Sequence, residues 1–467
     1  MISNLHLITT PSIYNQQLYD EIRLLEGTNQ GRPYLDTTGN SSVGIGFNLR
    51  GNPDVRDEVF RRMEIDPNAS GLSAAQQAAE LGYLNQLNAA ASGSYTSTAA
   101  VKKAFDDIMA ARANNPLFAG ISRITSLTTF TMTDPQMQAV FPVAALQAEI
   151  KVDAWLAGIL PSNERIALVS LAYNNLIGVN ANGTFKSPTL RQAIIDDNRA
   201  EAWYQIRYAS NGGLSRITSG EGIANRRIAE SNLFSLYDNP GLGVSEAEAK
   251  EVLRMYTTHR DAILDYESRF PTQFAATGVN TIQFQLIGAE TTLIGTYAHG
   301  RTIDGEVLVG QDAAPALALY ETVRGTSQGD LLFGEGGRDV LEGLMGRDVL
   351  YGGDGFDTLV GGLGDDWLEG GEGFDTYVYN TGDGNDRIED SDASGVIIVN
   401  GQMLAGGVKK AGHTDWTSPD GTITYVMSGT DLVVKLYDDI IMTVNENFVS
   451  GQFGIRLIDM VEERMAA

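Results

Sequence analysis

The sequence of 467 residues predicts a multidomain protein that is mostly helical in its first half and repetitive and strand-rich in its second half. Apolar residues recur at three- and four-residue spacings between 14 and 240, which indicates helices around one Gly-, Asn- and Thr-rich stretch at 27–48. From 325 to 378 an aspartate recurs every nine residues. From 396 onward short apolar runs alternate with turn residues, which predicts a small β cap.

The first half contains several helices and one strand-like segment. An amphipathic helix, IYNQQLYDEIRLLEG, ends at Gly27, and VGIGFNL follows as a strand. Residues 53–150 hold Ala-rich helical runs, and ERIALVSLAYNNLIG after them is apolar enough to cross a core. The breaker sequence NPG ends a predicted domain at 1–240. One further helix and a mixed segment predict a helical linker at 241–323.

Charge is distributed unevenly along the chain. Residues 1–240 contain 19 Lys and Arg against 22 Asp and Glu, a net charge of −3. The remaining 227 residues contain 14 against 37, a net charge of −23. This excess of acid argues against a nucleic-acid partner and favours a cation as the partner of the second half.

Several functional classes are disfavoured by composition. The chain has no cysteine, which excludes disulfides and thiolate chemistry, and its four histidines show no spacing typical of a zinc site. No apolar run approaches the length of a membrane span. The N-terminus lacks a basic region followed by an apolar run, so we expect no cleaved N-terminal signal.

A nine-residue register of aspartates begins after Gly325. Its aspartates are Asp330, Asp339, Asp348, Asp357, Asp366 and Asp375. Each is followed two places later by an apolar residue, at Leu332, Leu341, Leu350, Leu359, Leu368 and Tyr377. The last three units, GGDGFDTLV, GGLGDDWLE and GGEGFDTYV, fit the pattern G-G-x-G-x-D-x-U-x, where U is a large apolar residue.

This repeat suits calcium. Glycines let the turn present its carbonyl oxygens, the aspartate adds an anionic oxygen, and the apolar residue points into a core shared by stacked turns. We therefore expect Ca²⁺ to be bound by the six aspartates together with Gly352, Gly361 and Gly370. Without a cation the aspartates repel one another, so the array should unfold at low calcium. At about twenty times the dissociation constant each ion would contribute about 1.8 kcal/mol.

The segment resembles the RTX, or haemolysin-type, family of calcium-binding repeat proteins over about 325–467. The resemblance implies a parallel β-roll at 324–392, followed at 393–467 by a C-terminal β cap and an uncleaved secretion signal. It also implies type I secretion machinery as a partner and an extracellular, secreted location. It describes folding and delivery without naming an activity.

Candidate catalytic groups lie in EGTNQGRPYLDTTGNSSVGIGFNL, from Glu26 to Leu49. Glu26 ends a predicted helix, Asp36 follows at the start of a turn, and Ser42 adds a hydroxyl. Two carboxylates flanking a cleft are what glycosidic cleavage requires, one to protonate the leaving oxygen and one to stay ionised. Acidic residues in such hairpins are more often simply solvated, so the spacing alone leaves both interpretations open.

A wider pattern is similar to the phage-type lysozymes, the muramidases of glycoside hydrolase family 24. It comprises E-G, Y-x-D-T-x-G and a hydroxyl before V-G-I-G, then the core helix RIALVSLAYNNLIG and the late segment GIANRRIAESNLF, and it spans about 14–236. The resemblance implies an α+β lysozyme-like domain with these roles: Glu26 the general acid, Asp36 the second carboxylate, Ser42 the hydroxyl that helps to place water, and Arg226 or Arg227 the group that orients the acid.

The predicted function is therefore that of a secreted peptidoglycan hydrolase with an antimicrobial role. It would cleave the β-1,4 bond between N-acetylmuramic acid and N-acetylglucosamine. The sequence departs from the lysozyme pattern in a Glu26-to-Asp36 interval one residue longer than usual, in Ser42 for threonine and in Phe47 for histidine. The longer interval keeps open a non-catalytic, calcium-dependent wall or matrix-binding protein. A different glycan, such as chitosan, is a third possibility.

Overall fold

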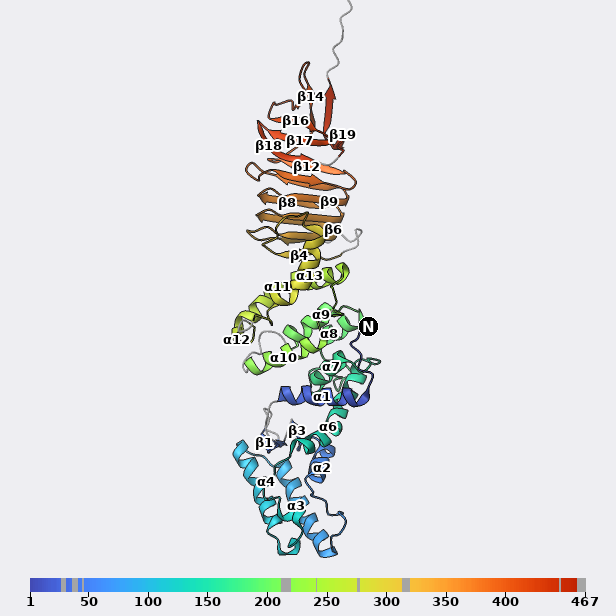
Figure 1. Cartoon of the computed structure of the whole chain (residues 1–467), viewed down its shortest axis with the longest axis vertical. Coiled ribbons are helices and arrows are strands. Elements are labelled where there is room, and N and C mark those ends of the chain that lie inside the picture. Colours follow the sequence, from blue (N-terminus) through green and yellow to red (C-terminus); the bar gives the residue numbers. More distant parts are fainter. Residues whose placement is uncertain are drawn as a thin grey trace, which may run out of the picture. The chain divides into compact units, whose positions relative to one another are not determined.

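The computed structural model describes residues 1–26, 31–35, 41–43, 46–210, 220–240, 242–274, 278–312, 320–444 and 447–459. The chain divides into two compact units, Met1–Asp238 and Asn239–Ala467 (Figure 1). The first is mostly helical, and the second carries the repeats as a parallel β-solenoid with helices before it and strands after it. The division falls two residues before the predicted domain end at 240.

The N-terminal unit begins with a helix and a small sheet. Helix α1 (Pro11–Glu26) ends one residue before Gly27, as the sequence predicts. Strands β1 (Tyr34–Leu35), β2 (Ser41–Val43) and β3 (Phe47–Asn48) form an antiparallel sheet in the order β1-β2-β3. The segment VGIGFNL, predicted as one strand, contributes the end of β2 and all of β3.

A helical segment follows the sheet, in the region of the predicted Ala-rich helical runs. Its elements are α2 (Pro53–Arg62), α3 (Ala74–Ser92), α4 (Thr98–Ala113), the 3-10 helix η1 (Pro116–Phe118) and α5 (Ser122–Thr125). Ser73 and Gln76 form a capping box that starts α3. Arg112 of α4 donates two hydrogen bonds to Glu80 of α3, at 2.9 and 2.6 Å, and both side chains are fully buried. This bidentate pair fixes the two helices together.

The rest of the N-terminal unit packs around one central helix. Its elements are α6 (Asp134–Trp155), α7 (Asn163–Tyr173), α8 (Pro188–Ile195), α9 (Arg199–Tyr204), the π-helix η2 (Gln205–Ala209) and α10 (Gly220–Phe234). Residues 164–172 of α7 are all buried, so this helix has no solvent-facing side. The run ERIALVSLAY therefore forms the core helix that its composition predicts, whereas NNLIG, which the sequence predicts to continue the helix, forms turns after Tyr173.

The C-terminal unit starts with helices that pack against the first turn of the roll. They are α11 (Glu246–Arg269), α12 (Pro271–Phe274) and α13 (Ile282–Tyr297). The Arg254 guanidinium donates to the carbonyl oxygen of Gly310 at 2.8 Å and to Glu335 at 2.9 Å. After α13, the His299 ring stacks on Trp367 at 3.9 Å between ring centroids. Most of the predicted linker, 241–323, thus belongs to the same compact unit as the repeats.

The roll consists of two parallel sheets that share β6 (Leu331–Met345). One sheet joins β4 (Val307–Val309), the start of β6, β7 (Val349–Gly355), β9 (Trp367–Gly373) and β11 (Asp386–Glu389). The other joins β5 (Tyr320–Arg324), the end of β6, β8 (Thr358–Leu363), β10 (Asp375–Tyr379) and β12 (Gly395–Val399). The stack of strands is visible in Figure 1.

Residues 18 positions apart therefore lie side by side in the roll. Leu332, Leu350 and Leu368 stack in one sheet, and Leu341, Leu359 and Tyr377 stack in the other. All six side chains are at most 1% exposed. Two nine-residue units make one full turn, so the predicted apolar positions alternate between the two sheets and fill a common core.

The strands after the roll close its C-terminal end. They are β13 (Gln402–Met403), β14 (Gly406–Lys409), β15 (Trp416–Thr417), β16 (Ile423–Ser428), β17 (Asp431–Leu436), β18 (Asp439–Val444), β19 (Ser450–Phe453) and β20 (Arg456–Asp459). Strand β18 pairs with β11 in parallel, so one sheet of the roll continues into the antiparallel strands β17 and β16.

We expect the helices before the roll to lower the calcium concentration at which it folds. A fragment spanning 239–467 should reach half of its β signal in circular dichroism at several-fold lower calcium than one spanning 320–467. The shorter fragment loses β4, which pairs with β6, and the stacking of His299 on Trp367. Equal calcium midpoints for the two fragments would show that these contacts contribute nothing to folding.

Candidate functional site

The six ladder aspartates are buried where the turns of the roll meet the strands. Their residue exposures are 0% for Asp330, 3% for Asp339, 0% for Asp348, 1% for Asp357, 0% for Asp366 and 0% for Asp375. Isolated buried carboxylates are costly unless hydrogen bonds or a cation compensate them. The partners of each carboxylate oxygen therefore decide what the ladder does.

One oxygen of each carboxylate links consecutive turns. The backbone N–H of Asp339 donates to Asp357 Oδ1 at 2.8 Å, and that of Asp357 donates to Asp375 Oδ1 at 2.8 Å. On the opposite edge, Asp348 bridges to Asp366 in the same way at 2.9 Å. The aspartates thus form two columns, one along each edge of the roll.

The second oxygen is left without a donor. Within the described part of the chain, the Oδ2 atoms of Asp339, Asp348, Asp357, Asp366 and Asp375 are buried and accept no hydrogen bond. Nearly all buried polar atoms in folded proteins have a partner, so five such anionic oxygens in register require an explanation. A bound cation supplies it.

Carbonyl oxygens face these unpartnered carboxylates across spaces that only glycine leaves open. A Cβ added to Gly334 would lie 2.5 Å from the Gly352 carbonyl oxygen and 3.0 Å from Asp339 Oδ2. A Cβ added to Gly352 would lie 2.5 Å from the Gly370 carbonyl oxygen and 2.7 Å from Asp357 Oδ2. Each space is therefore lined by one carboxylate and one carbonyl oxygen.

The third space of this kind involves the remaining predicted glycine. A Cβ added to Gly343 would lie 2.5 Å from the Gly361 carbonyl oxygen, and Asp348 Oδ2 is closer still. The structure thus brings together the predicted ligands in pairs: Gly352 with Asp339, Gly361 with Asp348, and Gly370 with Asp357. All of the atoms are hard oxygens, which is the donor set that Ca²⁺ prefers.

In the described residues, these spaces lack the cluster of several acidic, histidine or cysteine side chains that forms many metal sites. Among the residues described, no group of three or more His, Cys, Asp or Glu side chains converges as a metal site. Backbone carbonyls would supply most of the ligands here, with each carboxylate contributed singly. That arrangement explains why the nine-residue register, and not a cluster of acids, is the signal in the sequence.

The two ends of the ladder differ: protein donors satisfy Asp330 at the first end, whereas Asp375 Oδ2 at the last end has no donor among the described residues. At the first turn, the Thr326 N–H donates to Asp330 Oδ2 at 2.6 Å, so both oxygens of Asp330 have partners. At the last turn, the Tyr377 hydroxyl donates to Asp390 at 2.6 Å and accepts from the Gly370 N–H at 2.9 Å. Sequence reasoning missed Thr326 and Asp390. The only feature of the sequence that could have indicated the contact with Asp390 is Tyr377, which places a hydroxyl group where the other five units have leucine.

Burial controls the protonation of the free ladder. It raises the pKa of Asp339 to about 7, of Asp348 to about 8, of Asp357 to about 6, and of Asp366 and Asp375 to about 7. Water is excluded from these carboxylates, which disfavours their charged form. A cation at the same oxygens would have the opposite effect and favour the ionised form.

The predicted catalytic residues are only partly described. Glu26 is the last residue of α1, and Ser42 lies on β2, buried and paired with Tyr34 and Asn48 across the sheet. Asp36 lies outside the described residues, as does the side chain of Glu26. The separation of the two carboxylates therefore stays a prediction.

The two candidate arginines of α10 have different partners. Arg226 Nη2 donates to the carbonyl oxygen of Leu25 at 2.8 Å, which brings α10 to the end of α1. Arg227 forms an ion pair with Glu230, whose carboxylate also accepts a hydrogen bond from Ser170 at 2.5 Å. Burial raises the pKa of Glu230, while Arg227 opposes that shift.

Comparison with known proteins identifies the repeats. The RTX calcium-binding nonapeptide repeat, in four copies, matches residues 321–350 and 342–377. This part of the chain therefore carries RTX repeats that bind calcium, and repeats of this type are typical of secreted proteins. No curated protein matches the chain. In the described residues, no helix is long and apolar enough to cross a membrane.

Removing one unpartnered oxygen should weaken calcium-driven folding. We expect Asp357→Asn to raise the calcium midpoint of folding several-fold, because an amide carries no charge to bind the ion. The matched control is Asp354→Asn, which removes one charge from the same unit at an exposed position. Circular dichroism over a calcium titration measures both midpoints. A midpoint unchanged in Asp357→Asn, or shifted equally in both variants, would contradict the assignment.

We expect the calcium-free roll to become less stable as the pH rises, whereas carboxylates in salt bridges usually make a protein more stable as the pH rises. Burial raises the pKa of the five aspartates with unpartnered oxygens to about 6 to 8 in the folded roll, against about 3.9 in an unfolded chain. Between these values the folded state binds more protons, so stability is highest near pH 4 and falls as the pH rises toward 8. In chelator, the β signal should therefore be larger at pH 5 than at pH 8. Identical spectra at the two pH values would refute this expectation.

Proposed function

We propose that this protein is a secreted peptidoglycan hydrolase whose calcium-binding repeats serve folding after export. The observation that carries the proposal is the hydrogen bond from Arg226 to the carbonyl oxygen of Leu25, which joins two segments 201 residues apart. Both segments belong to the lysozyme-like pattern, one ending in Glu26 and the other containing the paired arginines. If the resemblance of these two segments to lysozymes were accidental, there would be no reason for the segments to lie in contact.

The order of elements around the end of α1 supports the proposal. Helix α1 ends at Glu26, the antiparallel sheet follows directly, and β2 carries Ser42. In the proposed mechanism Glu26 donates a proton to the leaving glycosidic oxygen. Asp36 remains ionised and activates water or stabilises positive charge on the sugar, and Ser42 helps to position the water. Arg226 would hold the acid through its contact at the end of the helix.

The calcium dependence of the roll also supports the proposal, because it suits a protein that folds after export. Five buried carboxylate oxygens without donors make the roll unfavourable in the absence of a cation. A chain that remains loose at low calcium can pass through type I secretion machinery and then fold outside the cell as it binds calcium. The peptidoglycan substrate lies in that external compartment.

The main test replaces the proposed acid. We expect Glu26→Gln to lower wall hydrolysis by at least about 10²-fold, because the amide is nearly isosteric but cannot donate the proton. Glu21→Gln on the same helix is the matched control and should retain activity. A turbidity assay on purified cell walls, with calcium present, measures both. If Glu26→Gln kept more than about a tenth of the rate, the role of Glu26 would be wrong.

The alternative is a non-catalytic wall- or matrix-binding protein, which the longer interval between Glu26 and Asp36 favours. A wild-type protein that sediments with purified walls in calcium but does not clear them would support that alternative. Clearing of the walls would exclude it.

A further inference from the structure

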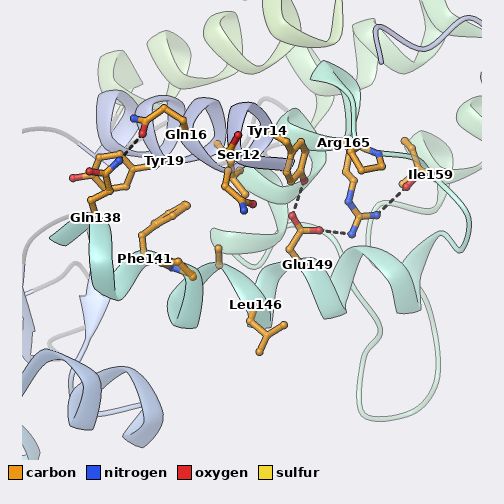
Figure 2. Close-up of a pocket in the computed structure, with 15 residues that line it drawn as sticks. Ser12, Tyr14, Gln16, Tyr19, Gln138, Phe141, Leu146, Glu149, Ile159 and Arg165 are labelled. Atoms are coloured by element: carbon orange, nitrogen blue, oxygen red, sulfur yellow. Dashed lines mark hydrogen bonds and ion pairs between the residues drawn. The ribbon is translucent and has the colours of Figure 1, made fainter. Parts of the chain in front are cut away.

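A pocket of about 770 Å³ lies between α1 and α6 in the N-terminal unit (Figure 2). The segment before α7 and the first turn of α7 close one end of it, where Ile159, Pro161 and Arg165 line the wall. Its size falls within the range of pockets that hold small organic ligands. It uses none of the proposed catalytic residues.

The floor of the pocket is apolar. Leu18 and Tyr19 of α1 and Phe141 and Ala145 of α6 contribute to it, and all four are at most 5% exposed. The Tyr19 and Phe141 rings meet edge to face at 5.3 Å between centroids. This contact fixes the floor in one arrangement.

One end of the pocket holds a polar network in which the only cation, that of Arg165, is already paired with carboxylates. The Tyr14 hydroxyl donates to Glu149 Oε1 at 2.6 Å, and the other Glu149 oxygen accepts from Arg165 (Figure 2). Arg165 also donates to Asp153 at 2.8 Å. Burial, and then the hydrogen bond to Glu149, raises the pKa of Tyr14 far above its usual value, so the phenol stays protonated.

The rim carries neutral hydrogen-bonding groups. The Gln138 side-chain amide donates to the Gln16 side chain, which bridges α6 and α1 (Figure 2). Ser12 and Asn15 also line the rim and are exposed. Pro142 has no N–H, so the Gln138 carbonyl lacks its usual donor four residues later in α6. The rim therefore offers amide, hydroxyl and carbonyl groups to a ligand.

We propose that this pocket binds a neutral saccharide that carries N-acetyl groups. Glu149 and Arg165 are the only formal charges among the lining residues, all of which the structure describes, and they neutralise each other. A phosphate or carboxylate ligand would find no unpaired cation there. A purely apolar ligand would cover the exposed polar side chains of Ser12 and Asn15 without giving them hydrogen-bond partners. A saccharide has both an apolar face and neutral hydroxyl and amide groups.

The proposed function supplies the identity of the saccharide, a fragment of the glycan strand. Gln16 precedes Glu26 by ten residues of α1, about 15 Å along the helix axis at 1.5 Å per residue. The pocket would therefore hold a part of the polymer away from the bond that is cut, and so increase the affinity for long glycan strands.

Binding of N,N′,N″-triacetylchitotriose to the full chain in calcium tests the proposal. Isothermal titration calorimetry is done in the Glu26→Gln background so that the probe is not consumed. We expect the double variant Gln16→Ala/Gln138→Ala, and separately Ala145→Leu, which fills the floor, to weaken binding at least 10-fold. The control Gln77→Ala/Gln86→Ala changes two exposed glutamines of α3 and should bind like the parent.

A second readout separates this inference from the proposed function. With Glu26 intact, the pocket variants should raise KM for insoluble walls while kcat holds. If both pocket variants bind the trisaccharide as tightly as the parent, or the parent does not bind it, the pocket proposal is overturned. If Glu26→Gln keeps full hydrolysis while the pocket variants lose binding, the proposed function fails and the saccharide pocket stands.

Discussion

A buried carboxylate oxygen without a hydrogen-bond donor is the constraint on which the C-terminal unit depends. Each ladder aspartate uses one oxygen to accept the backbone N–H of the turn before it, as Asp357 does for Asp339. At every ladder position after Asp330, the other oxygen lies close to the glycine backbone and accepts nothing from the described residues. The same side chain therefore joins the turns and requires a cation. Folding and calcium binding cannot be separated in such an arrangement, because the site does not exist in the unfolded chain.

Protein donors satisfy the ladder carboxylate at the first turn, whereas at the last turn Asp375 keeps one oxygen without a donor among the described residues. Thr326 satisfies Asp330 at the first turn, and the Tyr377 hydroxyl bonds to Asp390 at the last. The helices α11 and α13 cover the first strands, and β18 extends one sheet into the antiparallel cap. Calcium is thus needed at every ladder position after Asp330, because each later carboxylate keeps one oxygen without a donor among the described residues.

In the N-terminal unit, the described buried carboxylates of Glu80 and Glu164 are compensated by arginine partners. Arg112 pairs with Glu80, and Arg199 donates to Glu164, which also accepts from His6. Each of these buried carboxylates has charged or hydrogen-bonding partners from the same unit, which compensates for the loss of solvation. This contrast in how buried acids are compensated explains why calcium is expected to control one unit and leave the other folded.

The sequence by itself determined the features that follow from local periodicity. The register of nine fixed the aspartate columns and the buried apolar positions, and the helical spacing before Gly27 fixed the end of α1 at Glu26. Glycines that permit close approach of the turns were also visible, because their positions repeat. Such signals survive in a single sequence since each is set by neighbours only a few residues away.

Only the tertiary structure decided which distant residues meet. The sequence left Arg226 and Arg227 equivalent, and the fold assigned Arg226 to the end of α1 across 201 residues. The role of Asp390 opposite Tyr377 and the pocket between α1 and α6 likewise come from contacts that no local pattern encodes. Local rules specify the faces of helices and strands, whereas the pairing of those faces depends on how the whole chain buries its apolar surface.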